Sequence, residues 1–286
     1  MKTVEVLSEP HLASVLVSAV ASSTKRPGVV KKLPALTLVR PNVVLDGAHI
    51  ARYNKICGFK PEQGVPLIYP QMLTFPLVMS FFGSDACPWP ALGTVHLANR
   101  IEQKKSLRAG DAVRVEMQTG KLFAHEKGQG FTLDLRILRD DEVVWSATQS
   151  LLRVGVKEKS GQPYASPITA DAPLSRQADF SAASDLGRRY GEVSGDRNPI
   201  HLTALSAKLF GFRQAIAHGM WTKARALSCL LPAQPLEEAS VAVDFKTPLF
   251  LPARASLWTA RKQGGALFEV RDAKGQRPHL RGQLQY

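Results

Sequence analysis

The chain has 286 residues, of which 44% are hydrophobic and 21% charged, with three cysteines and a formal net charge of +13. These fractions are typical of a folded globular protein, and the length suits two domains of about 100–200 residues each. Three cysteines exclude a disulfide framework and favour a reducing compartment, so we expect a cytoplasmic protein. Since no apolar run reaches about 18 residues, we expect no membrane-spanning helix.

The positive charge is spread evenly along the chain. Residues 1–155 carry a net charge of +6 and residues 156–286 one of +7, and no Lys/Arg run is longer than two. A diffuse charge without a zinc-finger spacing or an aromatic RNA-binding signature argues against a nucleic-acid partner. It suits a phosphorylated small molecule or an acidic carrier protein equally well.

The first predicted element is a short helix from His11 to Ala21. Glu5 and Glu9 precede it, where a secretory signal would carry positive charge, so we expect no signal peptide. We assign residues 1–34 to an N-terminal extension.

The clearest linker is residues 157–175, which are rich in Ser, Pro, Gly and Ala. It separates a predicted domain at 35–156 from a second at 176–286. The two halves share a pattern at an offset of 137 residues, which matches Tyr53 with Tyr190, Cys57 with Ser194, and Gly58 with Gly195. A common offset favours an internal duplication.

Each half continues with the same order of elements. An apolar stretch of helical length is followed by an alternating segment and then by a pair of strand candidates around a turn. The helices are predicted at 72–82 and 220–231, the alternating segments at 94–98 and 240–245, and the strand pairs at 131–138 with 142–152 and 266–270 with 277–286. This order predicts an α+β protein in which an antiparallel sheet wraps round one long central helix, twice.

Residues 190–201 form the motif that carries chemistry. Asn198 can cap a helix with Pro199 in its first position, and we expect that helix to continue over 202–210. The preceding turn places Asp196 and His201 within reach of one shared water. A carboxylate and an imidazole so placed are suited to general acid–base catalysis near neutral pH.

A second motif, Ala217-His218-Gly219-Met220, lies directly before the second long helix. The N–H of Gly219, with the helix dipole behind it, suits a developing oxyanion. We expect His218 to be a structural hydrogen-bonding residue. A metal site from Asp196, His201 and His218 matches no usual zinc spacing, so no metal or other cofactor is expected. Ser194 lies outside a nucleophile-elbow motif, which argues against a serine hydrolase.

The pattern Y-x-x-x-S-G-D-x-N-P-I-H, followed by A-H-G-M, resembles the MaoC-like (R)-specific enoyl-thioester hydratases. The resemblance covers residues 190–231 directly. It implies a hotdog fold, and the N-terminal half is similar to the degenerate first hotdog of two-hotdog 3-hydroxyacyl-thioester dehydratases. The looser match there includes Tyr69-Pro70 and the segment 92–99.

The resemblance also implies residue roles. Asp196 and His201 match the family's catalytic pair and Gly219 its backbone oxyanion donor, while Ser194, Gly195, Asn198 and Pro199 shape the loop. Some members carry a serine eight residues after that glycine, where this chain has Leu227, beside Ser228. The first half lacks the pair, because Phe59 stands where the second half has Asp196, so one active site per chain is expected.

These features predict a lyase that interconverts trans-2-enoyl and (R)-3-hydroxyacyl thioesters of CoA or acyl carrier protein. Two alternatives remain open: a hotdog acyl-thioesterase, and a non-catalytic module that binds acyl thioesters or their carrier. Two hotdogs in one chain make an internal pseudo-dimer, and a homodimer of such chains is also compatible with the sequence.

Overall fold

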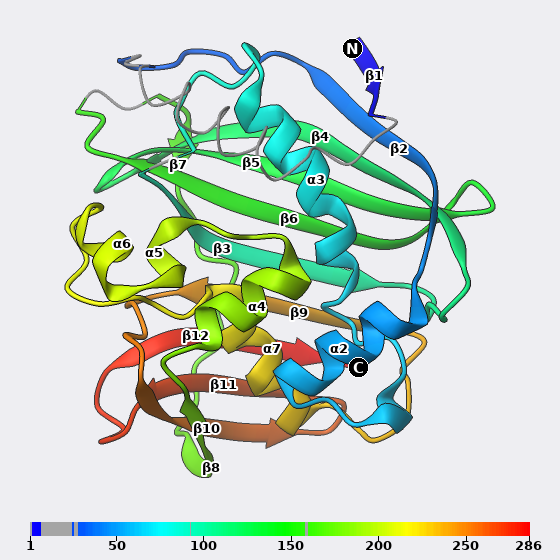
Figure 1. Cartoon of the computed structure of the whole chain (residues 1–286), viewed down its shortest axis with the longest axis vertical. Coiled ribbons are helices and arrows are strands. Elements are labelled where there is room, and N and C mark those ends of the chain that lie inside the picture. Colours follow the sequence, from blue (N-terminus) through cyan, green and yellow to red (C-terminus); the bar gives the residue numbers. More distant parts are fainter. Residues whose placement is uncertain (1, 7–24, 26–27, 92, 158–159) are drawn as a thin grey trace. The chain divides into compact units, whose positions relative to one another are not determined.

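The computed structural model describes residues 2–6, 25, 28–91, 93–157 and 160–286 (Figure 1). The helix predicted at 11–21 lies outside these residues. The chain divides into two compact units, each assembled from three segments: unit 1 comprises residues 1–45, 70–101 and 111–166, and unit 2 comprises residues 46–69, 102–110 and 167–286. Segments 46–69 and 102–110, which come from the first half of the sequence, therefore belong to unit 2.

Unit 1 is a mainly antiparallel sheet with one long helix packed on it. The strands follow the order β1 (Lys2–Glu5), β2 (Leu36–Val44), β4 (Ala112–His125), β5 (Gly128–Arg139), β6 (Glu142–Val154) and β3 (Thr94–Gln103). The outer strand β1 pairs parallel with β2, and a two-residue strand β7 (Gln162–Pro163), inside the predicted linker, pairs parallel with β4.

The helix of unit 1, α3 (Pro70–Gly83), contacts β2, β4 and β5. Its sequence is apolar on all sides, and Leu77 and Phe81 are fully buried. Phe81 packs against Phe131 of β5, with ring centroids 6.1 Å apart. The predicted turn after β5 is also present: Asp140 and Asp141 have positive φ angles of 52° and 61° and close a two-residue hairpin.

Unit 2 repeats this arrangement with five antiparallel strands. Their order is β9 (Ala239–Phe245), β12 (Pro278–Gln285), β11 (Gly265–Asp272), β10 (Ala253–Lys262) and β8 (Ser175–Ala182). The central helix α7 (Gly219–Leu230) contacts β11 and β12, as Figure 1 shows. Helix α2 (Gly47–Cys57) packs on α7 and on α4 (Leu186–Ser194), and the short 3₁₀ turn η1 (Pro61–Gln63) follows it.

The helix predicted over 202–210 was wrong in its extent. The structure has two short helices instead, α5 (Pro199–Leu202) and α6 (Ala204–Lys208), because Thr203 adopts an extended conformation with φ −145° and ψ 160°. The Thr203 hydroxyl accepts a hydrogen bond from the backbone N–H of Ser206, and the Ser206 hydroxyl accepts one from the N–H of Thr203. This reciprocal cap starts a new helix at the point where a single one was expected.

Among the described residues, no helix has both the length and the apolar character that crossing a bilayer requires.

Candidate active site

The turn after α4 holds Asp196. Gly195 ends the helix in the left-handed conformation, with φ 76°, and its N–H donates to the carbonyl of Gly191. The Asp196 N–H then donates to the Ser194 hydroxyl at 3.2 Å, and the Asp196 Oδ1 accepts from the Asn198 N–H at 3.1 Å. Asp196 is therefore held by local hydrogen bonds, while about a third of its side chain (34%) stays exposed.

Helix α5 places His201 beside this turn. Asn198 caps the helix by accepting from the Ile200 N–H at 3.3 Å, and Pro199 takes the first position. Gly187 of α4 lets the two helices approach: a Cβ there would lie 1.7 Å from the carbonyl oxygen of His201. The predicted cap is confirmed, and any residue larger than glycine at 187 would displace His201.

The hydrogen bonds of His201 define its tautomer. Its Nδ1 lies 2.7 Å from the backbone carbonyl of Ile216, which can only accept, so Nδ1 carries the proton. Burial lowers the pKa of His201 below its ordinary value, against the opposing effects of the Asp196 carboxylate and of this hydrogen bond. His201 is therefore neutral near pH 7, and Nε2 keeps a lone pair that can accept a proton.

His218 completes a cluster of three polar side chains. Its Nε2–H donates to the backbone carbonyl of Asp196 at 2.9 Å, and its ring stacks on that of His201 with centroids 3.7 Å apart and 26° between the planes. One ligand atom from each of Asp196, His201 and His218 lies within 4.8 Å of the others. The structure thus brings together the two residues predicted as the catalytic pair and adds a third.

This cluster has the composition of a metal site, but its geometry does not suit one. The two rings lie nearly parallel, so their nitrogen lone pairs do not converge on a point about 2.1 Å from both. The Nε2 of His218 is also committed to the Asp196 carbonyl. Rotating either ring toward a shared ion would break a buried hydrogen bond, so the absence of a metal stays our prediction.

The N-terminus of α7 adjoins the cluster. His218 is the residue that precedes the helix and makes no side-chain cap, and Gly219 is its first residue. The first N–H groups of a helix have no intrahelical acceptor and point along the positive end of its dipole. A Cβ at Gly219 would lie 2.8 Å from the Phe245 ring of β9, so glycine is needed here for close packing.

Two further residues of α7 bear on the resemblance. Leu227, at the position of the family's serine, is fully buried. The neighbouring Ser228 hydroxyl donates to the carbonyl of Arg225 at 2.9 Å and accepts from its guanidinium at 2.7 Å. Ser228 therefore has a local role on the helix and does not replace the missing serine.

Sequence reasoning missed a lysine buried in the central helix of unit 2, Lys223. It is fully buried in α7, one helical turn after Gly219, and burial lowers the pKa of its amine well below the ordinary lysine value. The only signal in the sequence is a lysine within a helix predicted to be buried. Buried lysines are rare, because taking the charge out of water is costly.

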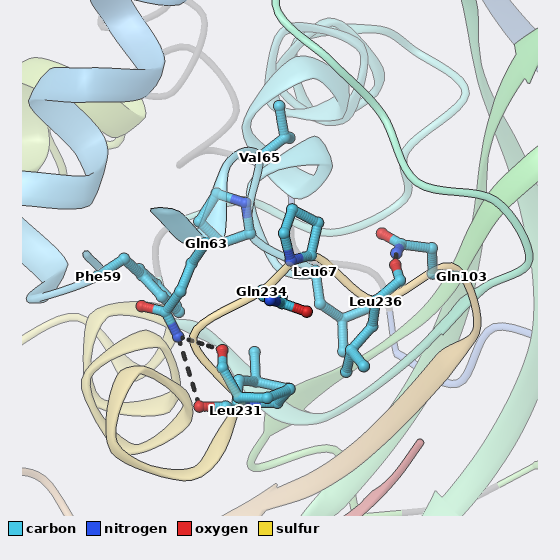
Figure 2. A pocket seen from close by; sticks show the side chains of 11 residues that line it. Phe59, Gln63, Val65, Leu67, Gln103, Leu231, Gln234 and Leu236 are labelled. Carbon is cyan, nitrogen blue, oxygen red and sulfur yellow. Dashed lines mark hydrogen bonds between the residues drawn. The ribbon is translucent and has the colours of Figure 1, made fainter. Parts of the chain in front are cut away.

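Unit 2 also contains a small pocket away from the cluster. Figure 2 shows it between the segment after α2, which contributes Phe59, Gln63 and Leu67, and the segment after α7, which contributes Leu231 and Leu236. Its volume is about 20 Å³, room for roughly one water molecule. The amide of Gln63, which lines the pocket, donates to the carbonyls of Leu231 and Pro232 at 3.5 and 3.0 Å.

The position of this pocket fits the duplicated pattern. At the offset of 137 residues, Phe59 corresponds to Asp196, and Gly64 corresponds to His201. The segment equivalent to the turn that holds Asp196 and His201 therefore lines, in the first half, a small pocket with both apolar and amide side chains. One active site per chain therefore stays a prediction.

Comparisons with known proteins agree with these features. A family model described as a MaoC-like domain matches residues 158–274. The 3-hydroxyacyl-thioester dehydratase X of Mycobacterium tuberculosis is 33% identical over 249 residues, covering 87% of this chain and 89% of that protein.

Two solved structures from the same organism extend the comparison. The crystal structure of HtdX has a TM-score of 0.75 at 31% identity and covers 87% of this chain and 98% of its own. A conserved hypothetical protein described as a double hotdog fold has a TM-score of 0.52 at 12% identity, covering 85% and 92%, and this likeness shows the fold alone. The predicted double hotdog fold is confirmed, and the chain belongs to the MaoC-like dehydratase family.

Proposed function

We propose that this protein is a lyase that catalyses the reversible hydration of trans-2-enoyl thioesters to (R)-3-hydroxyacyl thioesters. The observation that carries the proposal is a buried, neutral His201 with a ring nitrogen within 4.8 Å of an Asp196 carboxylate oxygen, next to the N-terminus of α7. The dehydratase activity named for the M. tuberculosis relative supports the same reaction class.

A single water between Asp196 and His201 begins the hydration. Their polar atoms lie within 4.8 Å of one another, and one water oxygen can reach both at ordinary hydrogen-bond distances of about 2.8 Å. The carboxylate accepts one O–H of the water and orients it. The Nε2 of His201 accepts the other proton as the water oxygen bonds to C3 of the substrate.

The electrons of the double bond then move toward the thioester carbonyl, which becomes an enolate oxygen. In the proposal, the N–H of Gly219 donates to this oxygen, because it lies at the positive end of the α7 dipole. The His201 imidazolium, stabilised by the Asp196 carboxylate, returns its proton to C2. One proton leaves the water and one reaches C2 on the same face, so the addition is syn and the site regains its starting state.

The thioester carrier belongs to the proposal as well. CoA and acyl carrier protein both present phosphopantetheine, and the net charge of +13 suits either the CoA phosphates or an acidic carrier surface. We propose no metal or other cofactor, since the two protonatable groups and the helix N-terminus supply all the steps. Dialysis against a chelator should therefore leave the turnover unchanged.

The test is an assay with crotonyl-CoA in which two signals are followed together. A hydratase removes the enoyl absorbance without releasing free thiol, and the reverse assay consumes (R)-3-hydroxybutyryl-CoA but not its (S) enantiomer. Release of free thiol would instead identify a thioesterase, and binding without either signal a non-catalytic module. Repeating the assay with enoyl-carrier substrates and with longer chains defines the carrier and the acyl length.

A further inference from the structure

His218 makes more contacts to the catalytic pair than the structural role expected of it requires. It is 3% exposed and lies between the two proposed catalytic residues, bonded to the backbone of Asp196 and stacked on the ring of His201. Its Nε2 bears the proton, because the Asp196 carbonyl can only accept. Its Nδ1 finds no hydrogen-bond partner among the described residues.

The surroundings of His218 keep its ring uncharged. Burial is the largest effect, the neighbouring His201 adds to it, and the Asp196 carboxylate opposes both, which together lower the pKa of His218 to about 3. The ring also contacts that of Tyr190, with centroids 4.8 Å apart. His218 is therefore a poor proton carrier at neutral pH, although it contacts both catalytic groups.

We propose that His218 is a positioning residue that fixes the Asp196 carboxylate and the His201 imidazole relative to one another during proton transfer. This inference rests on the proposed function. Asp196 lies on a turn with its side chain about a third exposed (34%), and the hydrogen bond from His218 ties its backbone to the start of α7. The stacked His218 ring restricts rotation of the His201 ring, whose Nδ1–H is hydrogen-bonded to the carbonyl of Ile216.

Two substitutions separate the two contacts. His218→Phe keeps a ring to stack on His201 but removes the hydrogen bond to Asp196, and His218→Gln keeps a donor near the position of Nε2 but removes the ring. We expect each variant to lower kcat by about 10- to 100-fold with KM changed less than about threefold, because small misplacements of catalytic groups have effects of this size. His218→Ala, which removes both contacts, should lower kcat more than either of these two variants does.

His279→Gln is the matched control. His279 is also a buried histidine of unit 2 with a lowered pKa, and its Nδ1 bonds to Thr247, away from the cluster. We expect this variant to lose stability but to keep kcat. If both His218 variants behaved like His279→Gln, His218 would have a purely structural role and the proposal would fail.

The pH profile distinguishes positioning from proton transfer. A positioning residue lowers the plateau of kcat without moving the acid limb, which His201 sets. If the pH profile of kcat lost its acid or its basic limb in His218→Phe, His218 would be a catalytic acid or base, and the proposal would be overturned.

Nitrogen-15 NMR of the imidazoles tests the arrangement without substrate. We expect His218 to stay neutral, with its proton on Nε2, from about pH 7 to about pH 5, and the Asp196 amide signal to shift or broaden in His218→Phe. A charged His218 in this range, or an unaffected Asp196 signal, would overturn the proposal even if the wild type proved to catalyse another reaction. Failure of the wild type to hydrate any enoyl thioester, with these NMR results unchanged, would instead reject the proposed function.

Discussion

Tyr53 of α2 and Tyr190 of α4 pack ring against ring in the interior of unit 2, with centroids 6.2 Å apart and the planes inclined by 52°. The two residues are equivalent in the duplicated sequence pattern, and both are almost completely buried. Contact between equivalent residues is typical of a two-fold arrangement of equivalent elements. Tyr190 also contacts the ring of His218, so the packing of the two tyrosines extends to the proposed active site.

The first prediction concerns the stability that this pair provides. Tyr53→Ala removes a fully buried ring that packs on Phe59, Tyr69 and Tyr190. Truncating a buried aromatic ring to alanine costs about 3–5 kcal/mol, so we expect a fall of this size in the free energy of unfolding measured by urea denaturation. Tyr53→Phe keeps the ring and serves as the control. A loss below about 1 kcal/mol in the alanine variant would contradict the packing argument.

The second prediction tests the catalytic pair. Asp196→Asn keeps an oxygen for the Asn198 N–H but cannot orient the water as a charged acceptor, and His201→Gln loses the basic nitrogen. We expect each to lower the rate of crotonyl-CoA hydration by about 10²- to 10⁴-fold, the usual contribution of a general acid or base. Circular dichroism should show that both variants remain folded.

Asp185→Asn is the control for this pair of variants. Asp185 precedes the same helix α4, forms an ion pair with Arg189 at 3.8 Å, and makes no side-chain cap. Exposed pairs of this kind contribute little, so activity and stability should both stay close to the wild type. Substantial hydration by both Asp196→Asn and His201→Gln would rule out the proposed mechanism.

The third prediction concerns Gly219. In Gly219→Ala the new Cβ meets the Phe245 ring at 2.8 Å, closer than such contacts allow, so we expect the start of α7 to shift. The backbone N–H of residue 219 is still present in this variant. We therefore expect kcat to fall because this N–H is displaced from the position of the enolate oxygen. Adding Phe245→Leu, which removes the obstructing ring, should restore part of kcat. If the double variant were no faster than Gly219→Ala, displacement by this ring would not be the cause.

Local signals in the sequence were sufficient for most elements around the site. The apolar stretches gave α3 and α7, and Asn198 with Pro199 gave the start of α5, because caps and periodicity act over a few residues. The error at Thr203 was also local: the reciprocal cap with Ser206 is readable from the sequence, and it stops the helix that the apolar residues beyond it favoured.

The tertiary relations could not be predicted in the same way. Nothing in the segment 46–69 indicates that it packs with unit 2, since its helix α2 has an ordinary amphipathic pattern. The motif predicted Asp196 and His201 as a pair, yet the stacking of His218 on His201 depends on where α7 begins in space relative to α5.

The last prediction follows from the buried histidines. The folded protein keeps His201, His218 and His279 neutral below their ordinary pKa of 6.5, whereas the unfolded chain binds protons on them near that value. The unfolded state therefore binds more protons, and the free energy of unfolding must fall as the pH drops below about 6.5. For His218 this window extends from about 6.5 down to about 3.

Chemical denaturation at several pH values from about 7 to about 5 checks this dependence above the range where most carboxylates titrate. Each histidine held neutral contributes up to about 1.4 kcal/mol per pH unit, so His218→Gln should show a slope smaller by up to that amount. An equal slope in the wild type and in His218→Gln would mean that His218 is protonated in the folded protein, contrary to the geometry described above.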